Sequence, residues 1–99
     1  MPTLNKPKKK QKNLTVNEQV RKEIYATTRW KKLRDAKIQQ NPLCEICLDK
    51  GLITLAVDVH HIQSFVSVSN PLKRKEIAFN FDNLQSLCKV CHQKIHNSN

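Results

Sequence analysis

The sequence predicts a small α+β domain. Three observations indicate it: apolar residues recur at helical spacing over 17–40, β-branched residues concentrate over 52–62, and the chain after Cys88 reads as a final helix. With 99 residues the chain fits one domain rather than two. Only 38% of the residues are apolar and 5% aromatic, so the core is small, and a domain of this size often depends on a metal ion or disulfides. We therefore expect more than hydrophobic burial to hold the fold.

Residues 1–16 are expected to form a disordered basic arm. The first 12 residues carry five Lys, two Pro and no acidic residue, a composition that cannot bury enough apolar surface to become ordered. The alternative is a tail that only aids solubility or remains from cloning. The remainder, residues 17–99, is the expected folded domain.

Residues 17–40 predict one helix or two short helices. Asn17 can cap the first helix, and Thr27 or Thr28 can cap the second. The pattern ends at Asn41-Pro42, because the residue before a proline avoids the helical region.

The two sides of this helical segment differ in character. Trp30 and Leu33 lie on the apolar side and are the expected core contacts. The other side is expected to face solvent and carries basic residues: Arg21, Lys22, Arg29, Lys31, Lys32, Arg34 and Lys37.

The middle of the chain predicts short elements. Gly51 is the only glycine and suits a turn with positive φ, after which residues 52–62 are strand-forming. Residues 64–82 give no clear element, and Asn70-Pro71 within them marks a turn. Residues 83–87 are a second short strand or an extended loop.

The four cysteines form two Cys-x-x-Cys pairs, or zinc knuckles, separated by residues 48–87: Cys44 with Cys47, and Cys88 with Cys91. Four thiolates complete the tetrahedral coordination of zinc and leave no open position, which is typical of a structural site. The alternatives are two disulfides, a redox pair, unrelated buried cysteines or an iron–sulfur cluster; the missing secretion signal disfavours disulfides. The gap exceeds the ~15 to 20 residues of a simple zinc ribbon, so zinc would tie together the ends of an inserted unit.

All four histidines fall in two places, His60-His61 at the end of the strand-forming stretch and His92 with His96 on the final helix. One helical step rotates about 100°, so Cys91 can face the zinc while His92 faces a neighbouring site. His96 lies four residues further on the same face and could join that site, although a frayed end with nothing to bind is the favoured reading. On an ideal strand His60 and His61 point to opposite faces, so either the strand bulges or ends there, or the pair has no chemical role.

Four pieces of the chain occur in a distinctive order: Cys44-x-x-Cys47, Val57-Asp58-Val59-His60-His61-Ile62, Asn80-Phe81-Asp82-Asn83-Leu84 and Leu87-Cys88-x-x-Cys91-His92. Their order and spacing resemble the HNH endonuclease family. The resemblance covers about residues 25–96, and its first part, from Tyr25 through Trp30 to Pro42, is similar to small HNH proteins of phages and prophages. It implies a ββα-metal fold over 52–96, within a nuclease domain over 17–99.

The resemblance also implies a role for each polar residue. His61 would be the general base that takes a proton from water. His60 and His92 would bind a catalytic divalent metal ion, with His96 as a further candidate ligand. Asn83 would hold the loop and orient the base.

The chain departs from the family pattern twice. Many members have a proline shortly after the His-Ile pair, where this chain has Gln63-Ser64, which affects the expected loop path but no ligand. Position 60 is Asp in many members and His here. Imidazole ligands suit Mn²⁺, Ni²⁺, Co²⁺ or Zn²⁺ better than Mg²⁺, so we expect Mn²⁺ or Ni²⁺ to support activity at least as well as Mg²⁺.

The charge of the chain is strongly unbalanced. Lys and Arg number 18 against 8 Asp and Glu, which gives a formal net charge of +10 and a pI of about 9.8, so we expect an acidic partner. No apolar run approaches the ~18 residues of a membrane span, so we expect a soluble protein that contacts no membrane. The residues expected to contact DNA phosphates are Arg29, Lys31, Lys32, Arg34, Lys73, Arg74, Lys75 and Lys94.

The resemblance implies a metal-dependent endonuclease that nicks or cuts DNA and leaves 5′-phosphate and 3′-hydroxyl ends. Small phage HNH proteins often act beside the DNA-packaging terminase, so terminase is a second expected partner and the cytoplasm of a bacterial host the expected location. We expect a monomer or a weak dimer. The alternative is a zinc-stabilised DNA-binding or adaptor protein without catalysis, which would need the four cysteines but not the histidines.

Overall fold

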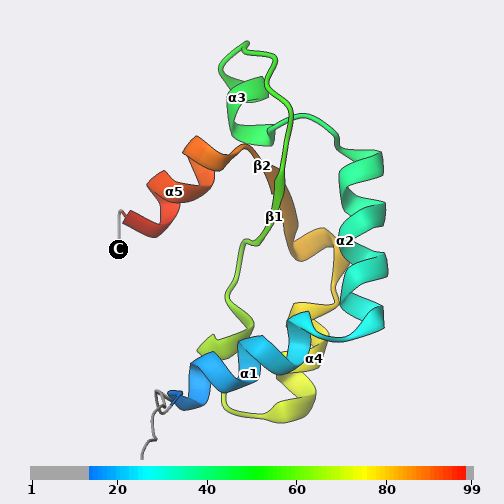
Figure 1. Ribbon diagram of the computed structural model, residues 1–99, viewed down its shortest axis with the longest axis vertical. Helices are drawn as coiled ribbons and strands as arrows, with labels where there is room; N and C mark the ends of the chain where they lie inside the picture. Colours follow the sequence, from blue (N-terminus) through cyan, green and yellow to red (C-terminus); the bar gives the residue numbers. More distant parts are fainter. Residues whose placement is uncertain (1–13, 98–99) are drawn as a thin grey trace, which may run out of the picture.

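The computed structural model describes residues 14–97 and confirms a small α+β domain (Figure 1). The elements in chain order, with η for short 3-10 helices, are α1 (Val16–Tyr25), α2 (Thr28–Gln40), α3 (Glu45–Asp49), β1 (Asp58–His61), η1 (Phe65–Ser67), α4 (Pro71–Ala78), η2 (Phe81–Asn83), β2 (Leu84–Leu87) and α5 (Lys89–Asn97).

The two strands form the centre of the molecule. They pair antiparallel, with Asp58 opposite Leu87 and His61 opposite Leu84. The knuckles and α3 lie at one end of this pair, α1 and α4 lie at the other, and α2 runs along one side between the two ends (Figure 1). Helix α5 leaves the second knuckle and packs on β1. No helix in residues 14–97 is long and apolar enough to cross a membrane.

Threonines cap both N-terminal helices. Thr15 caps α1 in a reciprocal capping box: the backbone N–H of Glu18 donates to Thr15 Oγ1 at 3.1 Å, and the Thr15 N–H donates to the Glu18 carboxylate at 2.9 Å. The prediction that Asn17 caps this helix was wrong, since Asn17 lies inside it. Of the two residues predicted to cap α2, Thr27 is the cap, because its hydroxyl accepts a hydrogen bond from the Trp30 N–H at 3.1 Å, and Thr28 is the first residue of the helix.

The disordered arm predicted over residues 1–16 extended too far toward the C-terminus. Thr15 and Val16 belong to the start of α1, where the capping box satisfies backbone groups that an arm would leave to water. Residues 1–13, the larger part of that prediction, lie outside the described residues.

The predicted strand over 52–62 was too long at both ends. The paired strand covers only residues 58–61, because its partner β2 has four residues and then enters the second knuckle. Before β1, the chain pairs with the first knuckle instead: the Cys44 N–H donates to the Thr54 carbonyl at 2.7 Å, and Leu55 forms an isolated bridge with Leu43. Gly51 has φ of 79°, as its predicted turn requires.

Helix α4 occupies part of the stretch that gave no clear element. Asn70 caps this helix, since its side-chain oxygen accepts hydrogen bonds from the backbone N–H groups of Leu72 at 2.9 Å and Lys73 at 3.2 Å, and Pro71 occupies the first turn. Asn70-Pro71 therefore begins a helix, and the prediction of a turn was wrong. An Asn cap followed by Pro is a helix-start signal, but the short segment after it has no clear apolar face.

Two small cores stabilise the two ends of the molecule. The buried cysteines pack with Leu87 at the knuckle end. Ile24, Phe65 and Ala78 pack at the other end, where α1, η1 and α4 meet. Trp30 is buried as predicted, and Leu33 is half-buried.

Lys37 is buried, although it was expected on the solvent-facing side of its helix. Its ammonium group lies 3.2 Å from the Glu45 carboxylate and donates to the Asn41 side-chain oxygen at 2.9 Å. The same carboxylate accepts a hydrogen bond from the Ser86 N–H at 2.6 Å. A charge can be buried where it is paired in this way, and the pair joins α2, α3 and β2.

Candidate functional site

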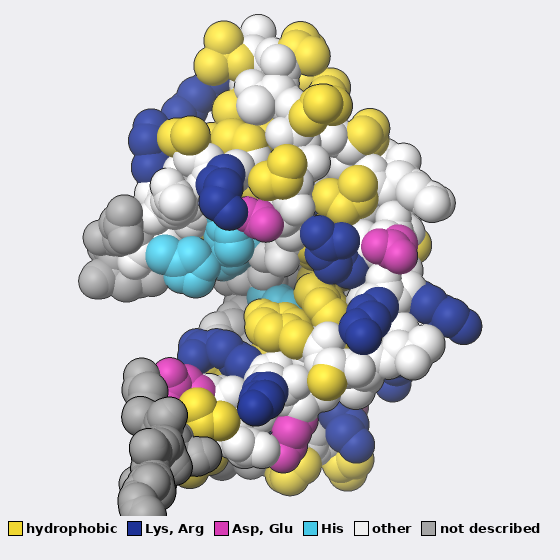
Figure 2. Space-filling view, viewed as in Figure 1, with side chains coloured by type: hydrophobic (Ala, Val, Ile, Leu, Met, Phe, Trp, Pro, Cys, Tyr) yellow, Lys and Arg dark blue, Asp and Glu magenta, His cyan; other side chains and the backbone are white. Residues whose placement is uncertain are grey.

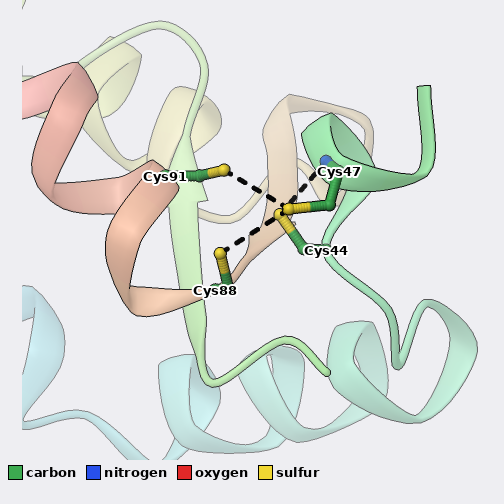
Figure 3. A group of neighbouring side chains, drawn as sticks. All are labelled: Cys44, Cys47, Cys88 and Cys91. Carbon is green, nitrogen blue, oxygen red and sulfur yellow. Dashed lines mark hydrogen bonds between the residues drawn. The ribbon is translucent and has the colours of Figure 1, made fainter. Parts of the chain in front are cut away.

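The four cysteine thiols converge between the two knuckles (Figure 3). Cys47 Sγ lies 3.6 Å from Cys91 Sγ and 3.9 Å from Cys88 Sγ, and all four sulfurs lie within 4.8 Å of one another. A disulfide needs about 2.05 Å, whereas sulfurs bound at 2.3 Å to a tetrahedral zinc ion lie about 3.8 Å apart. The cysteines are free thiols, and their spacing fits a four-coordinate metal ion.

The surroundings of Cys44 favour a metal-binding thiolate. Burial alone raises the pKa of the Cys44 thiol, but hydrogen bonds from backbone groups of Cys88 and Cys47 and from neighbouring thiols lower it overall to about 6. Cys44 is also the N-cap of α3, where the Cys47 N–H points at its sulfur at 3.5 Å. A negative sulfur is therefore stabilised before any metal binds.

A second group of potential metal ligands lies where α5 packs on β1. His60 from β1 and both histidines of α5 place one ring nitrogen each within 4.8 Å of one another. Nε2 of His96 lies 3.0 Å from Nε2 of His92. The structure thus brings His96 into the cluster, and the favoured reading of an isolated, frayed end was wrong. Burial and the nearby charges of His92, His96 and His61 lower the pKa of His60, which favours the neutral ring that binds metals.

Asp58 holds the central histidine of this cluster. Nδ1 of His92 lies 3.0 Å from the Asp58 carboxylate, so the ring N–H at Nδ1 donates to it and Nε2 keeps a lone pair toward the other histidines. Carboxylates commonly orient metal-binding histidines in this way. Asp58 was not among the predicted site residues, although it lies two residues before His60 and therefore on the same face of the strand.

His61 points to the opposite face of β1 from this cluster and is buried. Its Nε2 lies 3.0 Å from the Ala78 carbonyl, which can only accept, so Nε2 carries the proton and Nδ1 is the ring's acceptor. The ring stacks on Trp30 at 4.8 Å between centroids and meets the edge of Phe65 at 4.9 Å. Burial lowers the pKa of His61, opposed by the hydrogen bond to Ala78, and the neutral ring is favoured.

Asn83 holds the loop that follows β1. Its side-chain oxygen accepts from the Gln63 N–H at 2.8 Å, and its amide N–H group donates to the carbonyls of Gln63 at 2.9 Å and Ile77 at 3.1 Å. It thereby ties the loop after His61 to the end of α4, next to the carbonyl of Ala78 that holds the His61 ring.

A cleft of about 400 Å³ opens between the two ends of the molecule. Histidine side chains lie on its α5 side and basic side chains on its α1 side (Figure 2). It is lined by His60 and His61, whose side chains lie on opposite faces of β1, and by His92 and His96. On the α1 side it is lined by Arg21 and Tyr25. The candidate base and the candidate metal ligands therefore share one cleft.

None of the eight residues expected to contact DNA lines this cleft, within the described part of the chain. Several of them have partners inside the protein: Arg29 lies over the Phe79 ring at 4.2 Å, and Arg34 donates to the Val57 carbonyl at 3.1 Å. Arg74 donates to the Val68 carbonyl at 2.8 Å. The arginine that does line the cleft is Arg21, which was predicted on the solvent-facing side of its helix.

The HNH endonuclease family model matches residues 44–98, more than half of the chain. The crystal structure of the HNH endonuclease from the deep-sea thermophilic bacteriophage GVE2, with a manganese ion, superposes with a TM-score of 0.66 at 33% sequence identity, over 83% of this chain and 84% of that one. A search of curated proteins gave no match. The chain therefore belongs to the HNH endonuclease family and is a metal-dependent nuclease whose partner is DNA.

Proposed function

We propose that this protein hydrolyses DNA phosphodiester bonds with one divalent metal ion held by His60, His92 and His96, and leaves 5′-phosphate and 3′-hydroxyl ends. The observation that carries the proposal is the convergence of these three ring nitrogens on one side of a cleft whose other histidine, His61, has a free acceptor nitrogen. The ligand distances fit: nitrogens bound at ~2.1 Å to one ion lie roughly 3 Å or more apart.

In this proposal the proton moves to His61. Its Nδ1 takes the proton of a water molecule as that water attacks phosphorus, since Nε2–H is occupied by the Ala78 carbonyl. The bond from phosphorus to the 3′ oxygen breaks, this oxygen takes a proton from solvent water to become the 3′-hydroxyl, and the phosphate remains on the 5′ end. A divalent ion, when bound, supplies positive charge against the charge that develops on the phosphate and on the leaving oxygen.

The surroundings of His61 restrict its ring to one orientation. Trp30 stacks on one face, Phe65 contacts the ring from its edge, and the Ala78 carbonyl fixes the tautomer. Asn83 contributes indirectly, since its hydrogen bonds hold the loop that leads to Phe65 and the end of α4 that carries Ala78. A base whose ring is uncharged and held in one orientation needs no reorganisation before it accepts a proton.

The remaining elements of the proposal concern the four cysteines and the biological setting. The cysteines hold a structural zinc ion, and the two knuckles fix α5 so that His92 and His96 reach His60.

The likeness to a bacteriophage enzyme supports a phage or prophage origin, action in the bacterial cytoplasm and work beside the packaging terminase. One active site cuts one strand per encounter, so a monomer nicks DNA, and a double-strand break needs a second encounter or a weak dimer.

The choice of metal tests the proposal directly. Supercoiled plasmid incubated with protein that was dialysed free of loosely bound ions should be nicked with Mn²⁺ or Ni²⁺ at least as fast as with Mg²⁺, because imidazole nitrogens bind Mg²⁺ poorly. DNA ligase should reseal the nicks without any prior treatment, since that reaction requires 5′-phosphate and 3′-hydroxyl ends. Faster nicking with Mg²⁺, or nicks that ligase cannot reseal, would contradict the proposed ligand set or the proposed products.

The Asp58→Asn variant tests how the metal site is held. Without the carboxylate behind His92, the Mn²⁺ concentration for half-maximal nicking and the dissociation constant for Mn²⁺ should both rise about 10- to 100-fold. Calorimetric titration with Mn²⁺ gives the second value without DNA. Asp49→Asn, at an exposed position of α3, is the matched control and should leave both values unchanged; equal Mn²⁺ affinity in the Asp58 variant would remove Asp58 from the site.

A further inference from the structure

Two residues of α1 form the side of the cleft that faces the histidines. Arg21 and Tyr25 are four residues apart and share one face of the helix, and both line the cleft. Figure 2 shows basic side chains on this side of the hollow. Helix α1 precedes residues 44–98, which carry the match to the family model, so this side of the cleft comes from a different part of the chain.

Helix α1 is fixed relative to the candidate base. Ile24 is buried against Phe65 and Ala78, the residue whose carbonyl holds the His61 ring. The Tyr25 ring lies 5.4 Å from Trp30 and 5.8 Å from Phe65, between centroids. The residues that orient His61 therefore also hold the helix that carries Arg21.

Arg21 is available to bind an anion. Within residues 14–97 its guanidinium has no ion pair or hydrogen bond, whereas Arg29, Arg34 and Arg74 each contact groups of the protein itself. Burial raises the pKa of the Tyr25 phenol, and the positive charge of Arg21 opposes this rise, so the guanidinium lies close to the ring that lines the cleft. An unpaired arginine beside an uncharged cleft wall is suited to a phosphate, which it binds with two parallel N–H donors.

We propose that Arg21 binds a non-bridging oxygen of the scissile phosphate from the α1 side of the cleft, opposite the three metal-binding histidines. The inference rests on the proposed function, which puts the scissile phosphate within reach of a metal ion held by His60, His92 and His96. In the cleft, the metal site and Arg21 would then contact the phosphate from two sides, so that the charge gained during attack is stabilised on both. The lysines among the eight basic residues outside the cleft would contact other phosphates along the duplex.

Nicking by Arg21 variants tests the contact with the scissile phosphate. Arg21→Ala should lower kcat with saturating Mn²⁺ by about 10²-fold, as the loss of one donor to a developing oxyanion does. Arg21→Lys should recover part of this loss, because it keeps the charge but not the two-pronged geometry. Lys22→Ala removes the same charge from the next position of α1, outside the cleft, and should nick like the wild type.

A binding measurement separates this inference from the nuclease proposal. With a short DNA duplex and no divalent ion added, the plot of log affinity against log salt should have a slope smaller by about 1 for Arg21→Ala than for wild type and Lys22→Ala. If the wild type binds but never nicks, the nuclease proposal fails while this slope still decides whether Arg21 contacts a phosphate. An altered slope with unchanged kcat would place Arg21 on a flanking phosphate, and unchanged slope and kcat together would place it off the DNA; either result overturns the inference.

Discussion

Replacing Cys88 with serine is expected to abolish the cooperative fold. The two knuckles meet through four buried thiols, and only a few apolar residues pack around these thiols. Structural zinc contributes on the order of 10 kcal/mol in small zinc domains at neutral pH, whereas domains of this size are stable by only about 5–15 kcal/mol in total. Loss of one ligand should therefore remove most of the stability, and circular dichroism during heating should show no sharp transition.

Two controls make this result specific for the metal site. Leu48→Ser places the same side chain at an exposed position of α3 and should change stability by less than about 0.5 kcal/mol. A strong zinc chelator should unfold the wild type, and added Zn²⁺ should refold it. If Cys88→Ser melts like the wild type and the chelator has no effect, the thiols do not hold a structural metal ion.

Replacing His61 with alanine or glutamine is expected to lower the rate of nicking by about 10³-fold while DNA binding is retained, because the general base is lost and the basic surface is not. Alanine leaves a cavity beside Trp30 and Phe65, so its loss of activity could also reflect a loosened core. Glutamine keeps most of the volume and can still donate to the Ala78 carbonyl. The two variants together therefore distinguish a chemical role from a packing role.

The matched control for His61 is Gln93→Ala, an exposed position on α5 between the histidines and outside the cleft lining, which should nick like the wild type. Imidazole added to the buffer should restore part of the activity of His61→Ala, because it can enter the vacated space and accept the proton. Wild-type nicking by His61→Gln would show that the base lies elsewhere, and it would leave the metal ligands as the only assigned residues of the reaction.

Local signals in the sequence predicted much of the fold. The second strand, the final helix, the Thr27 cap and the turn at Gly51 are all present, because each depends on residues a few positions apart. The missed elements also had local signals. Asn70-Pro71 is a cap followed by proline and begins α4, and Thr15 with Glu18 is a capping box, but short helices without a clear apolar face are hard to recognise.

Errors about side chains have a different cause. Lys37 follows the pattern of an exposed lysine, and only the arrival of Glu45 from the next helix makes its burial favourable. Asp58, Trp30 and the Ala78 carbonyl support the histidines through contacts between residues 17 to 34 positions apart. No local pattern records such contacts, so the candidate ligands and the candidate base could be predicted from the sequence, but not the groups that hold them.

The sequence by itself determined the chemistry available: two thiol pairs spaced for one metal ion, histidines next to a knuckle, and an excess of positive charge. It also determined that Cys91 and His92 face different sites, since adjacent residues on a helix diverge by about 100°. Only the tertiary structure decided that His96 joins His60 and His92, that His61 is enclosed by aromatic rings, and that Arg21 faces them across the cleft. The physical reason is that bond geometry fixes directions within one turn or strand, whereas distances between α1, β1 and α5 depend on how their buried faces pack.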